Sequence, residues 1–250
     1  MWPYPKVVAH RGGGRLAPEN TLAAMRCGLE HGFRAVEFDV MLASDGVAIL
    51  MHDERLGRTV AGTGDISAYP SAALTAMDAG AWYGAQFAGE PVPLFADIAR
   101  YCKDHGIWMN VEIKPVPGFE EQTGVVAAQV VAQVFGADIA AGVPVQQLPL
   151  FSSFSFVAVQ AAQRTLPQVP RAWLVDIIPA DWQARLAELD AVALHTNHKN
   201  LTPELASAVK AAGYGLFCYT VNDLERAAEI RRWGVDGFCT DRIDLIPSNF

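Results

Sequence analysis

The sequence is poor in cysteine, and its few cysteines lie far apart. Only four occur in 250 residues, at Cys27, Cys102, Cys218 and Cys239, and no two of them form a CxxC pair. This spacing excludes the common zinc and disulfide-framework patterns and favours buried free thiols. Thiols that stay free are typical of a reducing compartment, so the expected location is the cytoplasm.

Positive charge and long apolar runs are scarce as well. Lys and Arg together number 19 against 27 Asp and Glu, which gives a formal net charge of −8. This balance disfavours nucleic acid and anionic membranes as partners, because both are bound through clustered basic side chains. We expect that no apolar stretch approaches the ~18–20 residues of a membrane span, and the start, Met1 to Lys6, leads straight into a strand-like run. We therefore expect a cytoplasmic protein with no membrane segment.

What the chain does contain is a regular alternation of apolar strand-like runs and helical patterns. Helices are predicted near 20–31 and 121–135, among others, and eight main strands are predicted to begin at Val7, Ala35, Trp108, Leu148, Ala172, Ala191, Tyr214 and Gly237. Such alternation indicates a parallel sheet with right-handed crossovers. Eight units in this length predict an α/β fold, a (β/α)8 TIM barrel, as one domain over residues 1–250. A six-stranded doubly wound sheet is the alternative.

The rhythm of strands and helices is interrupted after the second strand. A turn at Ser44-Asp45-Gly46 precedes a short apolar segment, Val47 to Met51, and the residues from about 53 to 92 are rich in glycine, alanine and aromatics. This stretch is too long for an ordinary loop and predicts a small insertion. Because it follows a strand end, it should cover the carboxyl end of the barrel, where such folds place their sites.

Acidic side chains stand at the ends of two predicted strands. Glu37 and Asp39 alternate with apolar residues, so both carboxylates lie on one face of their strand, and Glu112 has the same placement on the next main strand. Carboxylates held together in a protein interior repel one another unless a cation lies between them. A set of oxygen donors favours one Mg²⁺ or Ca²⁺ over zinc. Salt bridges within the barrel, for example to Lys114, are the structural alternative.

Two histidines and two basic residues follow the same strand ends. His10 ends the first strand, and His52 ends the short segment after the second. Two imidazoles on opposite sides of a phosphorus atom can take a proton from the nucleophile and give one to the leaving oxygen. Arg11 and Lys114 can hold the non-bridging phosphate oxygens. A single histidine would more often have a structural role, but two beside one acidic cluster favour catalysis.

Other polar residues carry weaker signals. Glu19 could anchor Arg11, whereas Asn20 reads first as the cap of the following helix. Later strands end in Ser152-Ser153-Phe154, His195-Thr196-Asn197-His198 and Tyr219-Thr220-Val221-Asn222, which would stand at the rim of the site. There they could bind a polyol, line the pocket or serve only as turns and caps.

The spaced motifs resemble those of the glycerophosphodiester phosphodiesterase family. The likeness runs from Val7 to Asp241 and rests on His10-Arg11-Gly12, Pro18-Glu19-Asn20-Thr21, Glu37-x-Asp39, Asp45-Gly46, His52-Asp53, Glu112-x-Lys114, Tyr219-Thr220-Val221-Asn222 and Gly234-Val235-Asp236-Gly237. The chain looks most like the cytoplasmic bacterial form that is tied to glycerol-3-phosphate uptake. Many members carry Trp at the position of Tyr219, which is a departure in the pocket wall.

This resemblance implies a TIM barrel that hydrolyses deacylated phospholipids to glycerol 3-phosphate and an alcohol with Mg²⁺ or Ca²⁺. By matching positions, it implies His10 and His52 as the acid–base pair, Glu37, Asp39 and Glu112 as metal ligands, and Arg11 and Lys114 as phosphate contacts. A lyase that stops at a cyclic phosphate, a Schiff-base lyase using Lys114 and a catalytically silent polyol-phosphate binder are the alternatives. The preferred alcohol, the oligomeric state and the order in which the histidines act are left open.

Overall fold

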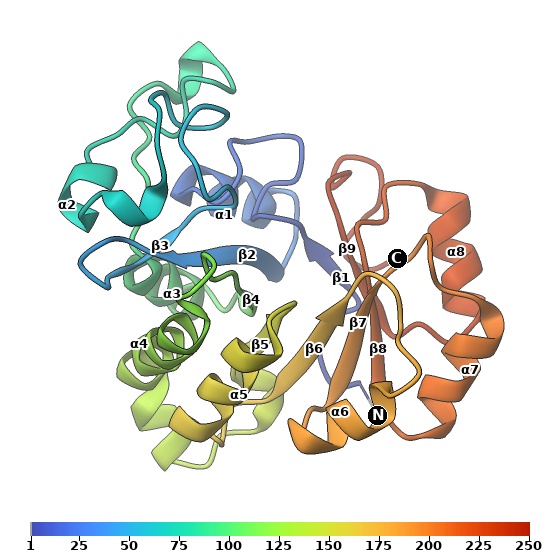
Figure 1. Cartoon of the computed structure of the whole chain (residues 1–250). Helices are drawn as coiled ribbons and strands as arrows, with labels where there is room; N and C mark the ends of the chain where they lie inside the picture. The colour runs from blue at the N-terminus through green and yellow to red at the C-terminus, as the bar shows by residue number, and fades with distance from the viewer. Residues whose placement is uncertain (1) are drawn as a thin grey trace.

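Eight parallel strands close into a barrel in the computed structural model, which describes residues 2–250. They are β1 (Val7–Ala9), β2 (Ala35–Leu42), β4 (Trp108–Ile113), β5 (Leu150–Ser153), β6 (Arg171–Val175), β7 (Ala193–Asn197), β8 (Gly215–Tyr219) and β9 (Gly237–Thr240). Each pairs with the next, and β1 pairs with both β9 and β2, so the sheet has no gap (Figure 1). This closure confirms the predicted TIM barrel and excludes the doubly wound sheet.

A ninth strand extends the sheet at one place. β3 (Ala48–Leu50) pairs antiparallel with the end of β2, with Val40 opposite Leu50. Between β3 and the next long helix lies the predicted insertion, which carries α2 (Ser71–Leu74) and the 3-10 turns η1 (Ile66–Ala68) and η2 (Ala85–Phe87). Its Leu56, Val60, Ile66 and Leu74 belong to a second apolar cluster, which also contains Met41 of β2 and Ile49 of β3. The insertion projects beside β3 at the upper left of Figure 1.

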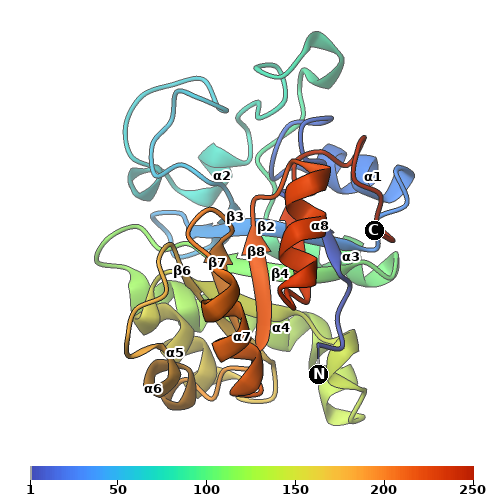
Figure 2. The ribbon, with the colours of Figure 1, turned by 90° about the vertical axis from the view of Figure 1, so that its right-hand side faces the viewer.

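Seven longer helices lie outside the strands (Figure 2). They are α1 (Leu22–Glu30), α3 (Phe95–Asp104), α4 (Glu120–Ala140), α5 (Phe156–Thr165), α6 (Trp182–Glu188), α7 (Pro203–Ala211) and α8 (Leu224–Arg232). Ser155 and Asp223 accept hydrogen bonds from the first turns of α5 and α8, which fixes where these helices begin. Within residues 2–250, no helix follows β9. The chain after β9 instead buries Ile246 and packs the ring of Phe250 near Phe238 of β9, with 6.1 Å between the two ring centroids.

Helix α4 corrects one expectation. By length and composition alone it could cross a membrane, with a mean hydropathy of 1.4 in its most apolar window. The expectation that no apolar stretch is this long is therefore wrong for residues 120–140. In the barrel, its Ala127, Val131 and Phe135 belong to the hydrophobic core. A Cβ at its Gly124 would stand only 2.2 Å from the carbonyl oxygen of Ala158, so α4 and α5 pack with their backbones very close.

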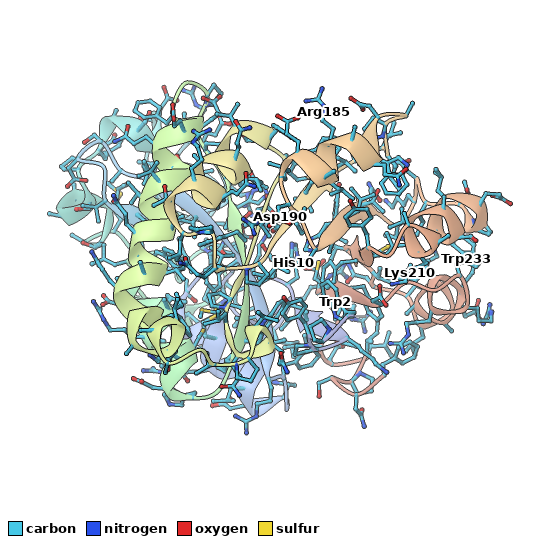
Figure 3. The ribbon with its side chains drawn as sticks, turned by 90° about the horizontal axis from the view of Figure 1, so that it is seen from below. Trp2, His10, Arg185, Asp190, Lys210 and Trp233 are labelled. Atoms are coloured by element: carbon cyan, nitrogen blue, oxygen red, sulfur yellow. The ribbon has the colours of Figure 1, made fainter. Side chains whose placement is uncertain are left out.

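The amino-terminal end of the barrel is closed by aromatic side chains. Trp2 stacks on Phe217 at 5.7 Å between ring centroids, and Tyr4 stacks on Trp108 at 4.9 Å. The view from below in Figure 3 shows Trp2 and His10 among the strands, inside the curve of the helices. Because this lower end is filled, a ligand can reach the barrel interior only from the opposite end, where the strands terminate.

Candidate active site

Three carboxylates from the paired strands β2 and β4 meet inside the barrel. The register pairs Asp39 with Glu112 directly across the two strands, and Glu37 lies two residues earlier on the same face of β2. Donor oxygens of all three lie within 4.8 Å of one another. Glu37 and Asp39 are buried, and Glu112 is partly buried. The predicted acidic cluster therefore exists as a compact group of oxygen atoms.

The electrostatics of this cluster are those of charges crowded in a poorly solvated place. Burial, together with the charges of Asp39 and Glu112, raises the pKa of Glu37 well above its ordinary value. Burial and the neighbouring Asp39 raise the pKa of Glu112 to about 8. For Asp39, burial acts in the same direction, but Lys114 and Arg11 outweigh it and lower the pKa to about 2. Oε1 of Glu37 is buried without a hydrogen-bond partner.

Two basic side chains border the acidic cluster. Lys114 Nζ lies 3.3 Å from Asp39 Oδ1 and 4.0 Å from Glu112 Oε1. Arg11 Nε lies 3.4 Å from Asp39 Oδ2, while its Nη1 donates to Glu19 Oε1 at 2.7 Å. Arg11 has a left-handed backbone with φ of 50°, and its backbone N–H donates to Glu37 Oε2 at 3.1 Å. The expected anchoring of Arg11 by Glu19 is present in the structure.

Each candidate histidine is held by an aspartate. His10 Nδ1 lies 2.6 Å from Asp241 Oδ1, and His52 Nδ1 lies 2.7 Å from Asp53 Oδ1. A carboxylate beside Nδ1 accepts a hydrogen bond from the N–H of that nitrogen. This bond favours the tautomer in which Nε2 carries no proton and can act as an acceptor. Burial lowers the pKa of His52. The charges of Arg11 and Lys114 lower this pKa further, whereas Asp39 and Asp53 act in the opposite direction and raise it. Both imidazoles line the same cavity of ≈ 230 Å³.

The two aspartates and one arginine have functions that sequence reasoning did not assign. Burial would raise the pKa of Asp53, but hydrogen bonds from Arg58 and His52 bring it to about 2. Arg58, in the insertion, donates to both Asp53 and Glu19 and so ties the His52 side of the site to the Arg11 side. The proximity of Asp53 to His52, and of Arg58 to Asp53, offered a local signal, whereas Asp241 and His10, like Arg58 and Glu19, lie far apart in sequence.

Asn20 does not have the cap role that its position suggested. The capping side chain of α1 is Thr21, whose Oγ1 accepts from the backbone N–H of Ala24. Asn20 has a φ of 59°, and its Nδ2 donates to Asp39 Oδ2 at 2.9 Å while its Oδ1 accepts from the backbone N–H of Asp39 at 3.1 Å. The left-handed turn thus directs Asn20 inward to hold one acid of the cluster.

The remaining predicted residues divide between the cavity and its support. Tyr219 lines the cavity, donates its hydroxyl to Val175 O at 2.9 Å and meets the ring of Phe154 edge-on at 5.7 Å. Asn222 does not line it; its Nδ2 donates to Asp241 Oδ2 at 2.8 Å. His195, expected at the rim, is instead completely buried and lines the cavity from below.

Fold and site together define a TIM-barrel hydrolase, and comparisons with known proteins agree. Residues 10–245 match the model of the glycerophosphoryl diester phosphodiesterase family. A curated glycerophosphodiester phosphodiesterase of Caldanaerobacter subterraneus is 30% identical over 94% of this chain and 93% of its own length. The chain belongs to the glycerophosphodiester phosphodiesterase family and is an enzyme of that class.

Solved structures give the same result. An Oleispira antarctica phosphodiesterase, determined in complex with the product sn-glycerol-3-phosphate, superposes with a TM-score of 0.88 and 37% identity, over 95% of this chain and 93% of that one. A glycerophosphodiester phosphodiesterase from Agrobacterium tumefaciens superposes with a TM-score of 0.76 and 28% identity, over 96% and 98% of the two chains. The resemblance to this family is thereby confirmed over nearly the whole chain.

Proposed function

We propose that the enzyme hydrolyses glycerophosphodiesters to sn-glycerol 3-phosphate and a free alcohol, with one Mg²⁺ or Ca²⁺ and a pair of histidines. The observation that carries this proposal is the convergence of two Asp-held imidazoles, three acids and two basic side chains on one cavity. The similar Oleispira protein holds sn-glycerol-3-phosphate as its product, which supports the same substrate class here.

The acidic cluster fits a hard divalent cation. All its donors are carboxylate oxygens, and Oε1 of Glu37 is buried with no partner of its own. Burying such a group without a partner costs about 1–3 kcal/mol, which a coordinated cation would offset. Glu37, Asp39 and Glu112 would hold the ion, and Ca²⁺ or Mg²⁺ is the class that prefers oxygen donors. When bound, the cation supplies positive charge next to the phosphate oxygens.

Arg11 and Lys114 would bind the non-bridging phosphate oxygens. Both lie beside Asp39, and Arg11 Nε is buried without a hydrogen-bond partner, so one donor is available to a ligand. A guanidinium and an ammonium fixed in advance stabilise the negative charge of the transition state without reorganising. The pairing of Lys114 with two carboxylates suits this role, whereas a Schiff-base lyase would need a desolvated neutral amine.

His10 and His52 would move the protons. One imidazole takes the proton of the attacking hydroxyl, and the other gives a proton to the oxygen of the departing alcohol. Asp241 and Asp53 hold each ring in a fixed tautomer and stabilise it when it is protonated. The attacking hydroxyl belongs either to water or to the glycerol moiety itself, and the second case would give a transient cyclic phosphate.

A coupled assay for released sn-glycerol 3-phosphate tests the proposal. The purified protein should act on glycerophosphocholine and glycerophosphoethanolamine, lose activity in EDTA and regain it with Mg²⁺ or Ca²⁺. His10→Ala and His52→Ala should each lower kcat at least ~10²-fold. His105→Ala, an exposed histidine on the outer surface, is the control and should retain the rate. Wild-type rates in folded His52→Ala would reject its role.

Phosphorus NMR of the product decides between hydrolysis and cyclisation. A phosphate monoester as the final product supports the hydrolase, while accumulation of a cyclic diester would identify a lyase.

We further propose a small-molecule substrate only, without nucleic acid or membrane as a partner, and a cytoplasmic location. The free cysteines, of which Cys102, Cys218 and Cys239 are buried, agree with a reducing compartment. Cell fractionation would test the location.

A further inference from the structure

His195 is a polar side chain in a place where it has nothing to bind. It lies on β7, is 0% exposed, and neither Nδ1 nor Nε2 has a hydrogen-bond partner. A buried polar group without a partner destabilises a fold, because it loses its hydrogen bonds to water and gains none. An apolar ring such as that of phenylalanine would pack beside Phe217, whose ring centroid is 4.6 Å from that of His195, without that loss. The mechanism proposed above makes no use of this imidazole.

The imidazole forms part of the floor of the active-site cavity. The lining of that cavity includes His195 and Asn110 together with His10, Glu37 and Lys114. Asn110 is also buried, and its Oδ1 has no hydrogen-bond partner. Asn110 lies directly opposite Glu37 in the register of β2 and β4. His195 and Asn110, which both carry unpartnered polar atoms, therefore line the same cavity as the acids.

The floor can be reached only through the mouth of the site. Trp2 lies beneath, with ring centroids 6.2 Å from His195 and 5.7 Å from Phe217, and it fills the lower end of the barrel. The cavity of ≈ 230 Å³ is several times the ~30 Å³ share of one water molecule, so it can accept a small polyol fragment. Phosphate held by Arg11 and Lys114 would leave one ester arm pointing downward and the other outward past Phe154.

The chemistry of the floor matches hydroxyl groups. Burial lowers the pKa of His195 to about 3, so the ring is neutral and presents one N–H donor and one nitrogen acceptor. The amide of Asn110 adds an acceptor. A hydroxyl both donates and accepts, whereas an alkyl or aryl group satisfies none of these atoms.

We propose that His195 and Asn110 form a subsite that binds the free hydroxyls of the glycerol moiety and selects it against ester arms that lack hydroxyls. The subsite rests on the proposed function, because it places the retained glycerol arm in the floor and the departing alcohol at the mouth. His195 then contributes to specificity and not to proton transfer.

Substrate comparison with matched variants tests the subsite. His195→Phe and Asn110→Leu should each lower the ratio of kcat/KM for glycerophosphocholine to that for bis(4-nitrophenyl) phosphate by about tenfold or more, mainly through KM. His195→Gln, which keeps a donor and an acceptor, should restore part of the ratio. Thr196→Val is the control: this neighbour is equally buried and unpartnered but lies outside the cavity lining, and its ratio should equal that of the wild type.

Binding and stability measurements separate this inference from the proposed function. Calorimetry should show that His195→Phe weakens sn-glycerol 3-phosphate about tenfold but changes the affinity for ethyl phosphate much less. The thermal midpoint of His195→Phe should not fall, because an unpaired polar group is replaced by an apolar ring. Equal losses for both ligands, or no loss at all, would overturn the subsite and identify His195 as a structural residue. Failure of the wild type to hydrolyse any glycerophosphodiester would overturn the proposed function, and the binding comparison would still decide on the subsite.

Discussion

Asp241→Asn is the most informative single change in the candidate site. Asp241 accepts from His10 Nδ1 through one oxygen and from Asn222 Nδ2 through the other, and its backbone N–H donates to Asn222 Oδ1. An asparagine side chain has only one oxygen, so either His10 or Asn222 would face its NH₂ group. If His10 accepts from that NH₂ at Nδ1, its proton moves to Nε2, which then no longer serves as a base.

The magnitude follows from the pKa of the carboxyl group. Burial would raise it, but the hydrogen bond and charge of His10, with help from Asn222, lower it from 3.8 to about 2. The difference corresponds to roughly 2.4 kcal/mol favouring the carboxylate. Asn222 and Arg11 share in this value with His10, so it is an upper bound on the interaction that the imidazolium can lose in the transition state. At 1.36 kcal/mol per tenfold, the rate then falls by at most roughly 60-fold. We therefore expect a loss in kcat of about ten- to 60-fold with little change in KM.

The assay is release of sn-glycerol 3-phosphate at saturating cation, with circular dichroism to confirm the fold. Asp244→Asn is the matched control, because Asp244 is a nearby exposed acid that pairs only with Arg242. It should keep the wild-type rate. If folded Asp241→Asn retained more than half of the wild-type kcat, the idea that Asp241 sets the tautomer of His10 would be wrong.

Three further changes follow from the structure. Arg58→Met should lower kcat/KM about tenfold, because it removes the hydrogen bonds that Arg58 donates to Asp53 and Glu19. Arg55→Met, which changes an exposed arginine of the same insertion, is the control and should not lower kcat/KM; the coupled assay compares the two variants. Gly28→Ala should destabilise the fold by about 1–3 kcal/mol, because the added Cβ would stand 2.3 Å from the backbone carbonyl oxygen of Gly12. Gly136→Ala in α4 is the control: its Cβ would meet nothing within 4 Å, and it should stabilise the fold by up to ~1 kcal/mol. Urea unfolding measures both changes. The pKa of Asp53 is about 2 in the folded protein against an ordinary 3.8, so the stability that its carboxylate contributes is complete above about pH 4 and declines as the pH falls towards 2. In urea unfolding at stepped pH, the free energy of unfolding of Asp53→Asn should therefore decline less steeply than that of the wild type. An unchanged slope would contradict this assignment.

Much of the site was predictable because it lies at strand ends. A strand has a period of two, so Glu37 and Asp39 had to share a face, and a barrel brings the ends of its parallel strands to one rim. One cavity is lined by the predicted catalytic, metal-binding and phosphate-binding residues together with Tyr219: His10, Arg11, Glu37, Asp39, His52, Glu112, Lys114 and Tyr219. Local pattern and one general property of the fold were enough for this part.

The partners that hold these residues were not predictable in the same way. Asp241 lies 231 positions from His10, and they meet because β9 pairs with β1, with Cys239 opposite Val8. No local pattern records a contact between two chain ends. Asn20 shows the converse failure: a cap pattern was read correctly as a helix start, but the adjacent Thr21 took the cap and a left-handed turn sent Asn20 to Asp39.

By itself, then, the sequence determined the order of strands and helices and which acids and imidazoles stand at the strand ends, because periodicity and turn chemistry act over a few residues. Only the tertiary structure decided that Asp241 orients His10, that Arg58 links the insertion to Glu19, and that His195 lies unpartnered in the lining of the cavity. Those relations depend on packing between segments that are distant in the chain, and only the three-dimensional arrangement of the strands brings them into contact.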